Sequence, residues 1–332
     1  MDIGTDVRIG VVGYGSWATA LVGLLTGKGI PVRWHVSNPD VLECLREEGR
    51  NPKYISDLEF DTQLLELSDD LNEVVSGSDL ILLATLSAYL KKFLEPLSVP
   101  LHDKFIVSAI KGIIQGEYTT VLEFIRDCYG VPEDQLFLIS GPTHAEDVAM
   151  KHPSFMTAAG FNAENTAKVA EIFTTKQMKV NTSSDVFGIE YASILKNIYA
   201  IASGLATGLG LGDNFLAALI SKCASELKDF LDACYPCERN ITDKAYLGDM
   251  LVTCYSPFSR NRRFGQLIGR GFSVKSAINE MTMTAEGYFG ADCIHRINET
   301  KGVDLPVSDM VYRILYEKSR PGRELSTLGK QL

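Results

Sequence analysis

The sequence lacks a segment that could cross a membrane. It contains no run of about 18 apolar residues free of charge and glycine, the length that a transmembrane helix needs. The N-terminus also lacks a basic region followed by a long apolar stretch, so no secretory signal peptide is predicted. We therefore expect a cytoplasmic chain with no stable membrane insertion.

An excess of basic charge is also missing. The chain carries 32 Lys and Arg against 42 Asp and Glu, a formal net charge of −10. Nonspecific binding to nucleic acid or to anionic membranes usually requires the opposite balance. We therefore expect no nucleic-acid partner, while a local basic pocket for a small phosphate remains compatible with the composition.

A cysteine framework is absent as well. The seven cysteines are scattered and odd in number, which indicates reduced thiols rather than disulfides. Cys234 and Cys237 form one C-x-x-C, but no second pair follows at the spacing of a zinc site. We therefore predict no metal site and expect these two side chains to pack near a helix end.

The first half of the sequence alternates short β-branched runs with helical stretches. Residues 7–12 show no polar alternation, which is typical of a strand buried on both faces. Further strand candidates lie at residues 32–36, 80–84, 105–109, 136–139, 155–159 and 178–180. Helical stretches such as residues 16–26 and 119–128 fall between them. This alternation predicts an α/β fold with a doubly wound, mainly parallel sheet and helices on both faces.

A glycine turn follows the first predicted strand and opens the first predicted helix. It reads Gly13-Tyr-Gly15-Ser-Trp-Ala18, a form of the dinucleotide-binding fingerprint. Gly13 permits the tight turn, Gly15 lets the backbone approach a pyrophosphate, and Ala18 allows close helix–strand packing. The helix N-terminus adds unpaired N–H groups and a partial positive charge. The first half is therefore predicted to be a Rossmann-type domain that binds a dinucleotide.

The end of the second predicted strand leaves the choice between NAD and NADP open. An acidic residue there would bind the ribose 2′-hydroxyl of NAD. Ser37 and Asn38 stand at this position, and neither repels a 2′-phosphate or attracts one as an arginine would. Asp40 lies slightly late, where it is expected to begin the next helix.

The pattern of apolar residues changes near residue 186. Strand-like runs disappear and helical periodicity continues to residue 317. We predict a dinucleotide-binding domain at residues 1–185 and an all-helical substrate and catalytic domain at residues 186–332. The tail from Arg320 is expected to be loosely held, with Pro321 and Gly322 in a simple turn.

One lysine stands on a predicted apolar helix face. In YASILKN, residues 191–197, the apolar side chains form a buried stripe around Lys196. Its amino group could reach water, pair with a carboxylate or take part in chemistry. Desolvation would lower its pKa toward neutrality, which suits a group that both donates and accepts a proton.

A series of motifs resembles the NAD(P)-dependent glycerol-3-phosphate dehydrogenases. They are, in order, GYGSWATAL, NPKY, AIKGI, SGPTHAEDVA, LKNIYAIASGLATGLGLGDN, LGDMLVTC, SRNRRFG and AEGY, and they span nearly the whole chain. The resemblance implies reversible reduction of dihydroxyacetone phosphate to sn-glycerol 3-phosphate, a phospholipid precursor, with NAD or NADP as cofactor. It also implies a homodimer and a small phosphorylated substrate.

The resemblance implies catalytic roles for three residues. The lysine of LKN is the family's proton acceptor, and it corresponds to Lys196. Lys111 matches a family lysine that contacts the substrate near the cofactor, where a second cation could polarise the carbonyl group. Asp249 matches an aspartate that orients the substrate hydroxyls, and a lysine partner would offset the cost of burying its charge.

The resemblance also implies two sets of binding residues. The substrate set is Lys111, Gly141, Thr143, Lys196, Asp249, Ser259, Arg260 and Asn261. The cofactor set is Gly13, Gly15, Ser16, Trp17, Ser37, Lys111, Ala145, Arg260, Thr284 and Glu286. In the phosphate site a guanidinium can bind two phosphate oxygens through parallel hydrogen bonds. The sequence departs from the family near Ser37, where many bacterial members carry an arginine that serves NADPH.

Two alternatives remain open at this stage. A β-hydroxyacid-type dehydrogenase acting on a carboxylate substrate also uses a helical lysine, but it leaves the SRN and LGDMLVTC motifs unexplained. A non-catalytic dinucleotide-sensing protein could share the scaffold. A mere binder, however, has no need of both Lys111 and Lys196.

Overall fold

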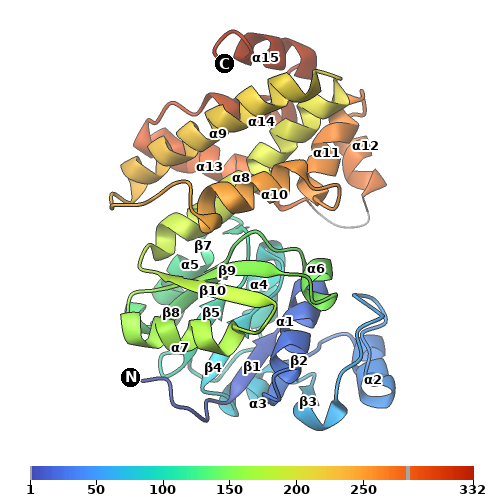
Figure 1. Cartoon of the computed structure of the whole chain (residues 1–332), viewed down its shortest axis with the longest axis vertical. Coiled ribbons are helices and arrows are strands. Elements are labelled where there is room, and N and C mark those ends of the chain that lie inside the picture. Colours follow the sequence, from blue (N-terminus) through green and yellow to red (C-terminus); the bar gives the residue numbers. More distant parts are fainter. Residues whose placement is uncertain (1, 282–284) are drawn as a thin grey trace. The chain divides into compact units, whose positions relative to one another are not determined.

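The computed structural model describes residues 2–281 and 285–332. Within them the chain forms two compact units. Unit 1 comprises Met1–Ile110 and Val121–Val186, and unit 2 comprises Lys111–Thr120 and Phe187–Leu332. Figure 1 shows strands flanked by helices in unit 1 and mostly helices in unit 2. None of the helices within the described ranges combines the length and apolarity that a membrane span requires.

Unit 1 contains one eight-stranded sheet, with the order β10-β9-β8-β5-β4-β1-β2-β3. The strands are β1 (Ile9–Val12), β2 (Val32–His35), β3 (Leu65–Ser68), β4 (Leu80–Leu83), β5 (Phe105–Ser108), β8 (Leu136–Ser140), β9 (Ser154–Gly160) and β10 (Met178–Ser183). Every neighbouring pair is parallel except β8 and β9. The predicted α/β class with a mainly parallel sheet is confirmed.

The helices of unit 1 connect these strands. They are α1 (Ser16–Thr26), α2 (Pro39–Glu48), α3 (Leu71–Ser76), α4 (Ser87–Leu94), α5 (Val121–Tyr129), α6 (Ala145–Ala149) and α7 (Ala163–Phe173), with the short helices η1 (Thr62–Leu64) and η2 (Glu133–Gln135). The strands β1, β4, β5 and β8 are buried along their whole length, because helices cover both faces of a doubly wound sheet. The order places β1 between β4 and β2, where the winding reverses. Ligands of such sheets bind at the carboxyl ends of the strands at this point.

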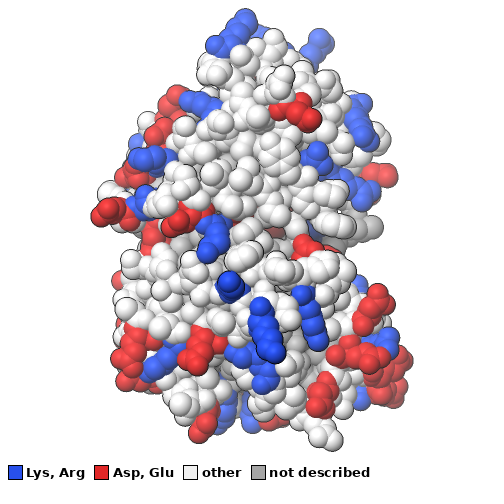
Figure 2. All heavy atoms as spheres, viewed as in Figure 1, with Lys and Arg blue, Asp and Glu red and all other residues white. Residues whose placement is uncertain are grey.

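Basic side chains gather at the middle of the visible face of unit 1, with acidic ones at its sides (Figure 2). Lys28, Lys151 and Lys176 line a cavity of 300 Å³ in this unit. The amino group of Lys28 donates hydrogen bonds to the carbonyl oxygens of Glu171 and Ile172, at 2.7 and 2.9 Å. The C-terminal ends of α1 and α6 border the cavity, and their partial negative charge opposes anion binding there.

Unit 2 consists of one small hairpin and a set of helices. The hairpin pairs β6 (Ile113–Ile114) with β7 (Thr119–Thr120), and β6 packs against α13. The helices are α8 (Val186–Gly208), α9 (Gly212–Cys234), the π-helical turn η3 (Lys244–Gly248), α10 (Asp249–Tyr255), α11 (Arg260–Gly269), α12 (Val274–Glu280), α13 (Glu286–Lys301), α14 (Pro306–Tyr316) and α15 (Pro321–Leu328).

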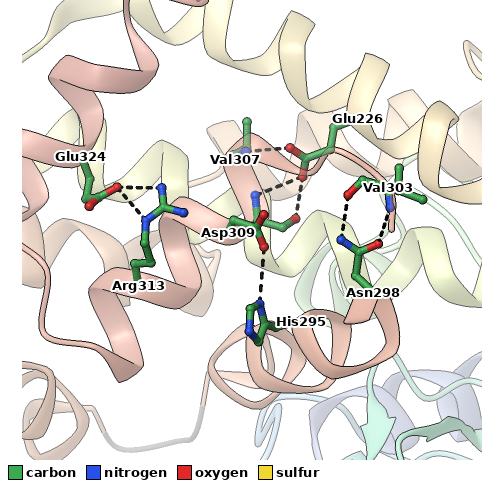
Figure 3. Close-up of polar contacts among 9 residues, drawn as sticks. Glu226, His295, Asn298, Val303, Val307, Asp309, Arg313 and Glu324 are labelled. Carbon is green, nitrogen blue, oxygen red and sulfur yellow. Dashed lines mark hydrogen bonds and ion pairs between the residues drawn. The ribbon is translucent and has the colours of Figure 1, made fainter. Parts of the chain in front are cut away.

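A carboxylate from α9 satisfies the N-terminus of α14. The residue before α14, Leu305, makes no side-chain cap, so the first N–H groups of the helix need another acceptor. Glu226 accepts hydrogen bonds from the backbone N–H groups of Val307 and Ser308, at 2.6 and 3.0 Å, and from the Ser308 hydroxyl at 2.6 Å (Figure 3). Burial raises the pKa of this carboxyl group to about 7. The contact ties two helices together across 81 residues of sequence.

The C-terminal tail is ordered, so the expectation of a loose tail was wrong. Residues from Pro321 onward form α15, with Leu325 and Leu328 buried. Arg313 of α14 binds Glu324 of α15 at 2.8 Å (Figure 3). Two buried leucines and an ion pair therefore hold a segment whose proline and glycine suggested only a turn.

The C-x-x-C pair lies at the end of α9. Cys234 is the last residue of the helix and is partly buried, but Cys237 is exposed. The predicted packing therefore fails for Cys237, whose sulfur accepts a 3.0 Å hydrogen bond from Arg239. In the described ranges, no three His, Cys, Asp or Glu side chains gather in a way that could hold a metal ion.

Candidate active site

The glycine turn of unit 1 has the shape of an anion cradle. Gly13 has φ +114°, and a side-chain carbon there would lie 2.4 Å from the carbonyl oxygen of Ala84. Gly15 is different, because a carbon added there would meet no atom within 4 Å. Gly15 caps α1 without a side-chain hydrogen bond, and no acidic residue lies in the first helical turn. Backbone N–H groups and the positive end of the helix are thus available to a pyrophosphate, as a bound dinucleotide requires.

Two buried side chains hold the backbone of this turn by hydrogen bonds. The Asn51 side chain donates hydrogen bonds to the Tyr14 carbonyl oxygen and to the Thr19 hydroxyl, both at 2.9 Å. The indole N–H of Trp34 donates to the Gly13 carbonyl oxygen at 2.6 Å. Both supporting side chains are fully buried. Sequence reasoning assigned them no role, since their contacts join segments that are 21 or more residues apart.

The end of β2 combines an amide, a carboxylate and an unexpected cation. Ser37 is exposed, and Asn38 caps α2 by accepting a hydrogen bond from the Val41 N–H. Asp40 lies in the first turn of α2, as the sequence indicated. The amino group of Lys53 lies 3.3 Å from the Asn38 side-chain oxygen and 3.4 Å from the Asp40 carboxylate. Lys53 therefore brings positive charge to the position where the sequence showed none.

A further glycine turn of unit 1 follows β8. Gly141 has φ +147°, and an added side-chain carbon would lie 2.7 Å from the Phe155 carbonyl oxygen. Thr143 is buried, and both its N–H and its hydroxyl donate to the Gly141 carbonyl oxygen. His144 caps α6, and Ala145 is the first residue of that helix. The predicted residues Gly141, Thr143 and Ala145 therefore share one strand-to-helix turn.

The predicted catalytic residues meet in unit 2. Lys196 of α8 forms an ion pair with one carboxylate oxygen of Asp249, and Lys111 lies 3.7 Å from the other oxygen. The side chain of Lys196 is 4% exposed and that of Asp249 is 1% exposed, whereas Lys111 retains 21%. Two amines thus face one buried carboxylate, so a single negative charge serves two basic groups.

This environment changes the acidity of Lys196. Burial lowers its pKa from 10.5 to about 7, because the desolvated amine loses more when it is charged. The neighbouring Lys111 contributes to this lowering of the pKa, while Asp249 acts in the opposite direction. At neutral pH the amine therefore exists in both protonation states, which is the condition for efficient proton exchange.

Local structure explains how the three residues converge. The stripe that buries α8 leaves Lys196 among apolar neighbours, as in the sequence-based prediction. Asp249 begins α10 directly after the π-helical turn η3, a rare geometry that is frequent at functional sites. The Asn197 side chain donates a 3.0 Å hydrogen bond to the Lys111 carbonyl oxygen. That contact fixes the backbone of Lys111, which belongs to unit 2 although the preceding residue, Ile110, belongs to unit 1.

An amide chain continues from Asn197 to the start of α13. The Asn261 side chain donates to the Asn197 side-chain oxygen at 2.9 Å and accepts a hydrogen bond from the Gly287 N–H, also at 2.9 Å. A carbon added at Gly287 would lie 2.5 Å from the Asn197 carbonyl oxygen. The first turn of α13, which begins with Glu286, is therefore held directly against α8.

The predicted phosphate residues open α11. Ser259 caps this helix by accepting a hydrogen bond from the Arg262 N–H at 3.3 Å. Arg260 is its first residue, and one buried guanidinium nitrogen of Arg260 finds no hydrogen-bond partner among the described residues. A buried guanidinium nitrogen without a partner is costly, so its presence at a helix N-terminus fits an anion site.

Glycines bring α8 and α11 into backbone contact. A carbon added at Gly204 would lie 2.0 Å from the Arg262 carbonyl oxygen, and one at Gly265 would lie 2.1 Å from the Ile201 carbonyl oxygen. Gly208 and Gly269 extend the contact by one turn. The helix that carries Lys196 and the helix that begins with Arg260 are thus packed without intervening side chains.

The structure gathers the predicted residues into separate groups. Unit 2 joins Lys111, Lys196 and Asp249, and unit 1 joins the glycine turn with Ser16 and Trp17, which open α1. Thr284 lies outside the described residues.

Comparisons with known proteins cover almost the whole chain. Residues 8–167 match the family model of the NAD-dependent glycerol-3-phosphate dehydrogenase N-terminus, and residues 185–326 match that of its C-terminus. The chain is 34% identical over 313 residues to "Glycerol-3-phosphate dehydrogenase [NAD(P)+]" of Chlorobium limicola, covering 94% of each chain. It is 35% identical over 311 residues to the protein of the same name in Prosthecochloris aestuarii, covering 93% of each.

A solved structure of a glycerol-3-phosphate dehydrogenase also matches this chain over nearly its whole length. The crystal structure of glycerol-3-phosphate dehydrogenase from Coxiella burnetii superposes with a TM-score of 0.89 at 30% sequence identity. The match covers 97% of this chain and 98% of the other. The sequence matches and the structural match therefore indicate the same family for both units.

Proposed function

The chain belongs to the NAD-dependent glycerol-3-phosphate dehydrogenase family, and from this premise we propose that Lys196 is the acid–base group of its reaction. The reaction interconverts dihydroxyacetone phosphate and sn-glycerol 3-phosphate with NAD or NADP. The dinucleotide, when bound, supplies or accepts the hydride. The protein must therefore bind the substrate and exchange a proton with its oxygen.

The observation that carries this proposal is the buried Lys196–Asp249–Lys111 cluster. In the reducing direction the Lys196 ammonium gives its proton to the carbonyl oxygen as negative charge develops there. In the oxidising direction the neutral amine takes the proton back. A pKa of about 7 makes both forms available.

The two neighbours of Lys196 have distinct proposed tasks. Asp249 holds the amine in position and orients the substrate hydroxyls. Lys111 polarises the carbonyl group, because its positive charge favours the developing alkoxide. The positive charge of Lys111 also helps to lower the pKa of Lys196.

Binding of the two ligands is proposed for the remaining residues. Ser259, Arg260 and Asn261 bind the substrate phosphate. This assignment is supported by the guanidinium nitrogen of Arg260 that has no hydrogen-bond partner among the described residues. Gly141 and Thr143 complete the substrate set. The dinucleotide is assigned to Gly13, Gly15, Ser16, Trp17, Ser37, Ala145, Thr284 and Glu286, with Lys111 and Arg260 in contact with it.

The test is a steady-state assay with the purified full chain. Dihydroxyacetone phosphate is mixed with NADH or NADPH in turn, and the loss of nicotinamide absorbance is followed. Turnover that Lys196→Ala removes supports the proposal. Turnover of a 3-hydroxy acid instead would indicate a β-hydroxyacid-type dehydrogenase, and tight dinucleotide binding without turnover would indicate a sensor.

We further propose that the chain acts as a cytoplasmic homodimer and supplies glycerol 3-phosphate to phospholipid synthesis. The family resemblance supports these three statements. Sedimentation velocity of the purified chain tests the dimer, and fractionation of the source cells tests the location.

A further inference from the structure

A large cavity lies in unit 2 at the opposite end of α11 from Arg260. Its volume is 720 Å³, within the range of about 300–1,000 Å³ that small-molecule sites show. Its walls come from the α11–α12 connection, α12, α13, and the α14–α15 connection. The lining residues that carry the argument are Phe272, Lys275, Ile278, Tyr316, Lys318 and Arg320.

The walls of this cavity are apolar. Phe272 and Ile278 are 43% and 44% exposed, although large apolar side chains are usually covered. Tyr316 contributes mainly its ring, because its hydroxyl donates a 2.7 Å hydrogen bond to the Tyr288 carbonyl oxygen. These surfaces favour a hydrocarbon group over water.

The charged side chains among the described lining residues of the cavity are all positive. Lys275, Lys318 and Arg320 line it, and no acidic residue is found among the described lining residues. In the part of the chain that the structure describes, none of the three forms an ion pair. The N-terminus of α15, which starts at Pro321, adds a partial positive charge. Three cations that form no ion pair with any described residue, in a chain of net charge −10, indicate an anionic partner.

We propose that this cavity binds a single-chain amphipathic anion with a phosphate monoester head group. The alkyl chain lies against Phe272, Ile278 and the Tyr316 ring. The phosphate lies between Lys275, Lys318 and Arg320, since a doubly charged head matches three cations better than a carboxylate does. A cavity of 720 Å³ that is partly open to solvent accommodates one chain and leaves the head at the charged rim.

The experiment uses dodecyl phosphate, below its critical micelle concentration, titrated calorimetrically into the full-length protein. Inorganic phosphate and dodecyl maltoside serve as the head-only and uncharged-head probes. We expect saturable binding of dodecyl phosphate at one site, with at least about tenfold weaker binding of either control probe. Equal binding of dodecyl maltoside, or of inorganic phosphate, would overturn the proposal.

Variants separate the two halves of the site. Lys275→Glu combined with Lys318→Glu should weaken dodecyl phosphate binding by about a hundredfold and leave dodecyl maltoside binding unchanged. Phe272→Asp should weaken the binding of both amphiphiles. Lys222→Glu, on α9 outside the cavity, is the matched control and should change neither affinity.

Two readouts separate ligand binding from misfolding and from self-association. The rate of dihydroxyacetone phosphate reduction without amphiphile should be the same in the charge-reversal variant and the parent, which shows that the fold is intact. Sedimentation velocity of Phe272→Asp should match that of the parent protein. A changed oligomeric state would show that a second copy of the chain covers this face, and the ligand proposal would be wrong.

Discussion

Lys196 and Lys111 share one carboxylate, because their amino groups face different oxygens of Asp249. The arrangement places a second positive charge beside an amine that is already desolvated. Both effects favour the neutral amine, and a single aspartate only partly opposes them. The cluster therefore couples the acidity of Lys196 to the presence of Lys111.

Removal of the Lys196 amine should abolish proton exchange. Lys196→Ala is expected to lower kcat by about a thousandfold, because general acid–base groups contribute about 10²–10⁴ in rate. Dinucleotide affinity, measured by quenching of protein fluorescence, should remain unchanged. Lys222→Ala on α9 provides the control, and a kcat near the parent value in Lys196→Ala would exclude the lysine from the mechanism.

The pH profile should follow the protonation of Lys196. Reduction needs the ammonium form, so kcat/KM for dihydroxyacetone phosphate should fall as pH rises through about 7. Oxidation needs the neutral amine, so kcat/KM for glycerol 3-phosphate should rise through the same pH. Lys111→Met removes a neighbouring positive charge and should shift both inflections to higher pH. An unchanged inflection in this variant would contradict the coupling of the two amines.

Loss of the Arg260 guanidinium should weaken substrate binding. Arg260→Ala is expected to raise KM for dihydroxyacetone phosphate by about a hundredfold, because charge-assisted hydrogen bonds contribute about 1.5–3 kcal/mol. The exposed Arg263, three residues later on α11, gives the matched control Arg263→Ala. If the dinucleotide affinity changed while this KM did not, the phosphate assignment would be wrong.

The two glycines of the first turn should respond differently to substitution. Gly13→Ala introduces a carbon against the Ala84 carbonyl oxygen at a positive φ and should destabilise unit 1 by about 1–3 kcal/mol. The β-carbon of Gly15→Val would meet no described atom within 4 Å, so the fold should survive while NADH affinity falls at least about tenfold. Thermal unfolding and fluorescence titration measure the two effects. Full NADH binding by Gly15→Val would show that no ligand approaches Gly15.

Glu226 should give the stability of unit 2 a pH dependence. Its pKa is raised from 4.5 to about 7, so the folded chain binds more protons than the unfolded chain between these values. The associated stability is fully present below pH 4.5 and is lost as pH rises through about 7. The loss amounts to at most about 3 kcal/mol.

Urea unfolding at about pH 5 and about pH 8 measures this effect. Glu226→Gln cannot titrate, so the difference in unfolding free energy between the two pH values should become smaller. The variant should also be less stable at both pH values, because the amide caps α14 more weakly. Glu299→Gln, at an exposed position of α13, should keep the parent pH dependence. A parental slope in Glu226→Gln would mean that another group titrates.

Much of unit 1 could be predicted from sequence because its elements are locally encoded. The helix over residues 16–26 has the predicted bounds, and the fully apolar runs became buried central strands. The edge strand β3, Leu65–Ser68, was missed because its partly exposed pattern lacks an apolar run. α15 was missed because Pro321 suits a turn and a first helical position equally well.

The contacts that shape the candidate site were harder to predict. The burial of Lys196 is readable from its apolar neighbours on α8. The support of Gly13 by Trp34, and the anchoring of Lys111 by Asn197, depend on packing between distant segments. The capping of α14 by Glu226 spans 81 residues, so no local pattern around Leu305 could indicate it.

The backbone contact of α8 with α11 has a consequence for chain-length selectivity. Because Gly204 lies against the Arg262 backbone and Gly265 lies against the Ile201 backbone, a shift of either helix would break these contacts. We therefore expect the interval between the Lys196 amine and the Arg260 guanidinium to stay nearly constant. We expect a ketone phosphate with one carbon more between carbonyl and phosphate to fit this interval less well. Selectivity for the chain length of ketose phosphates would then depend on the backbone packing of α8 against α11. Substitutions that alter only the side chains lining the site would not change it.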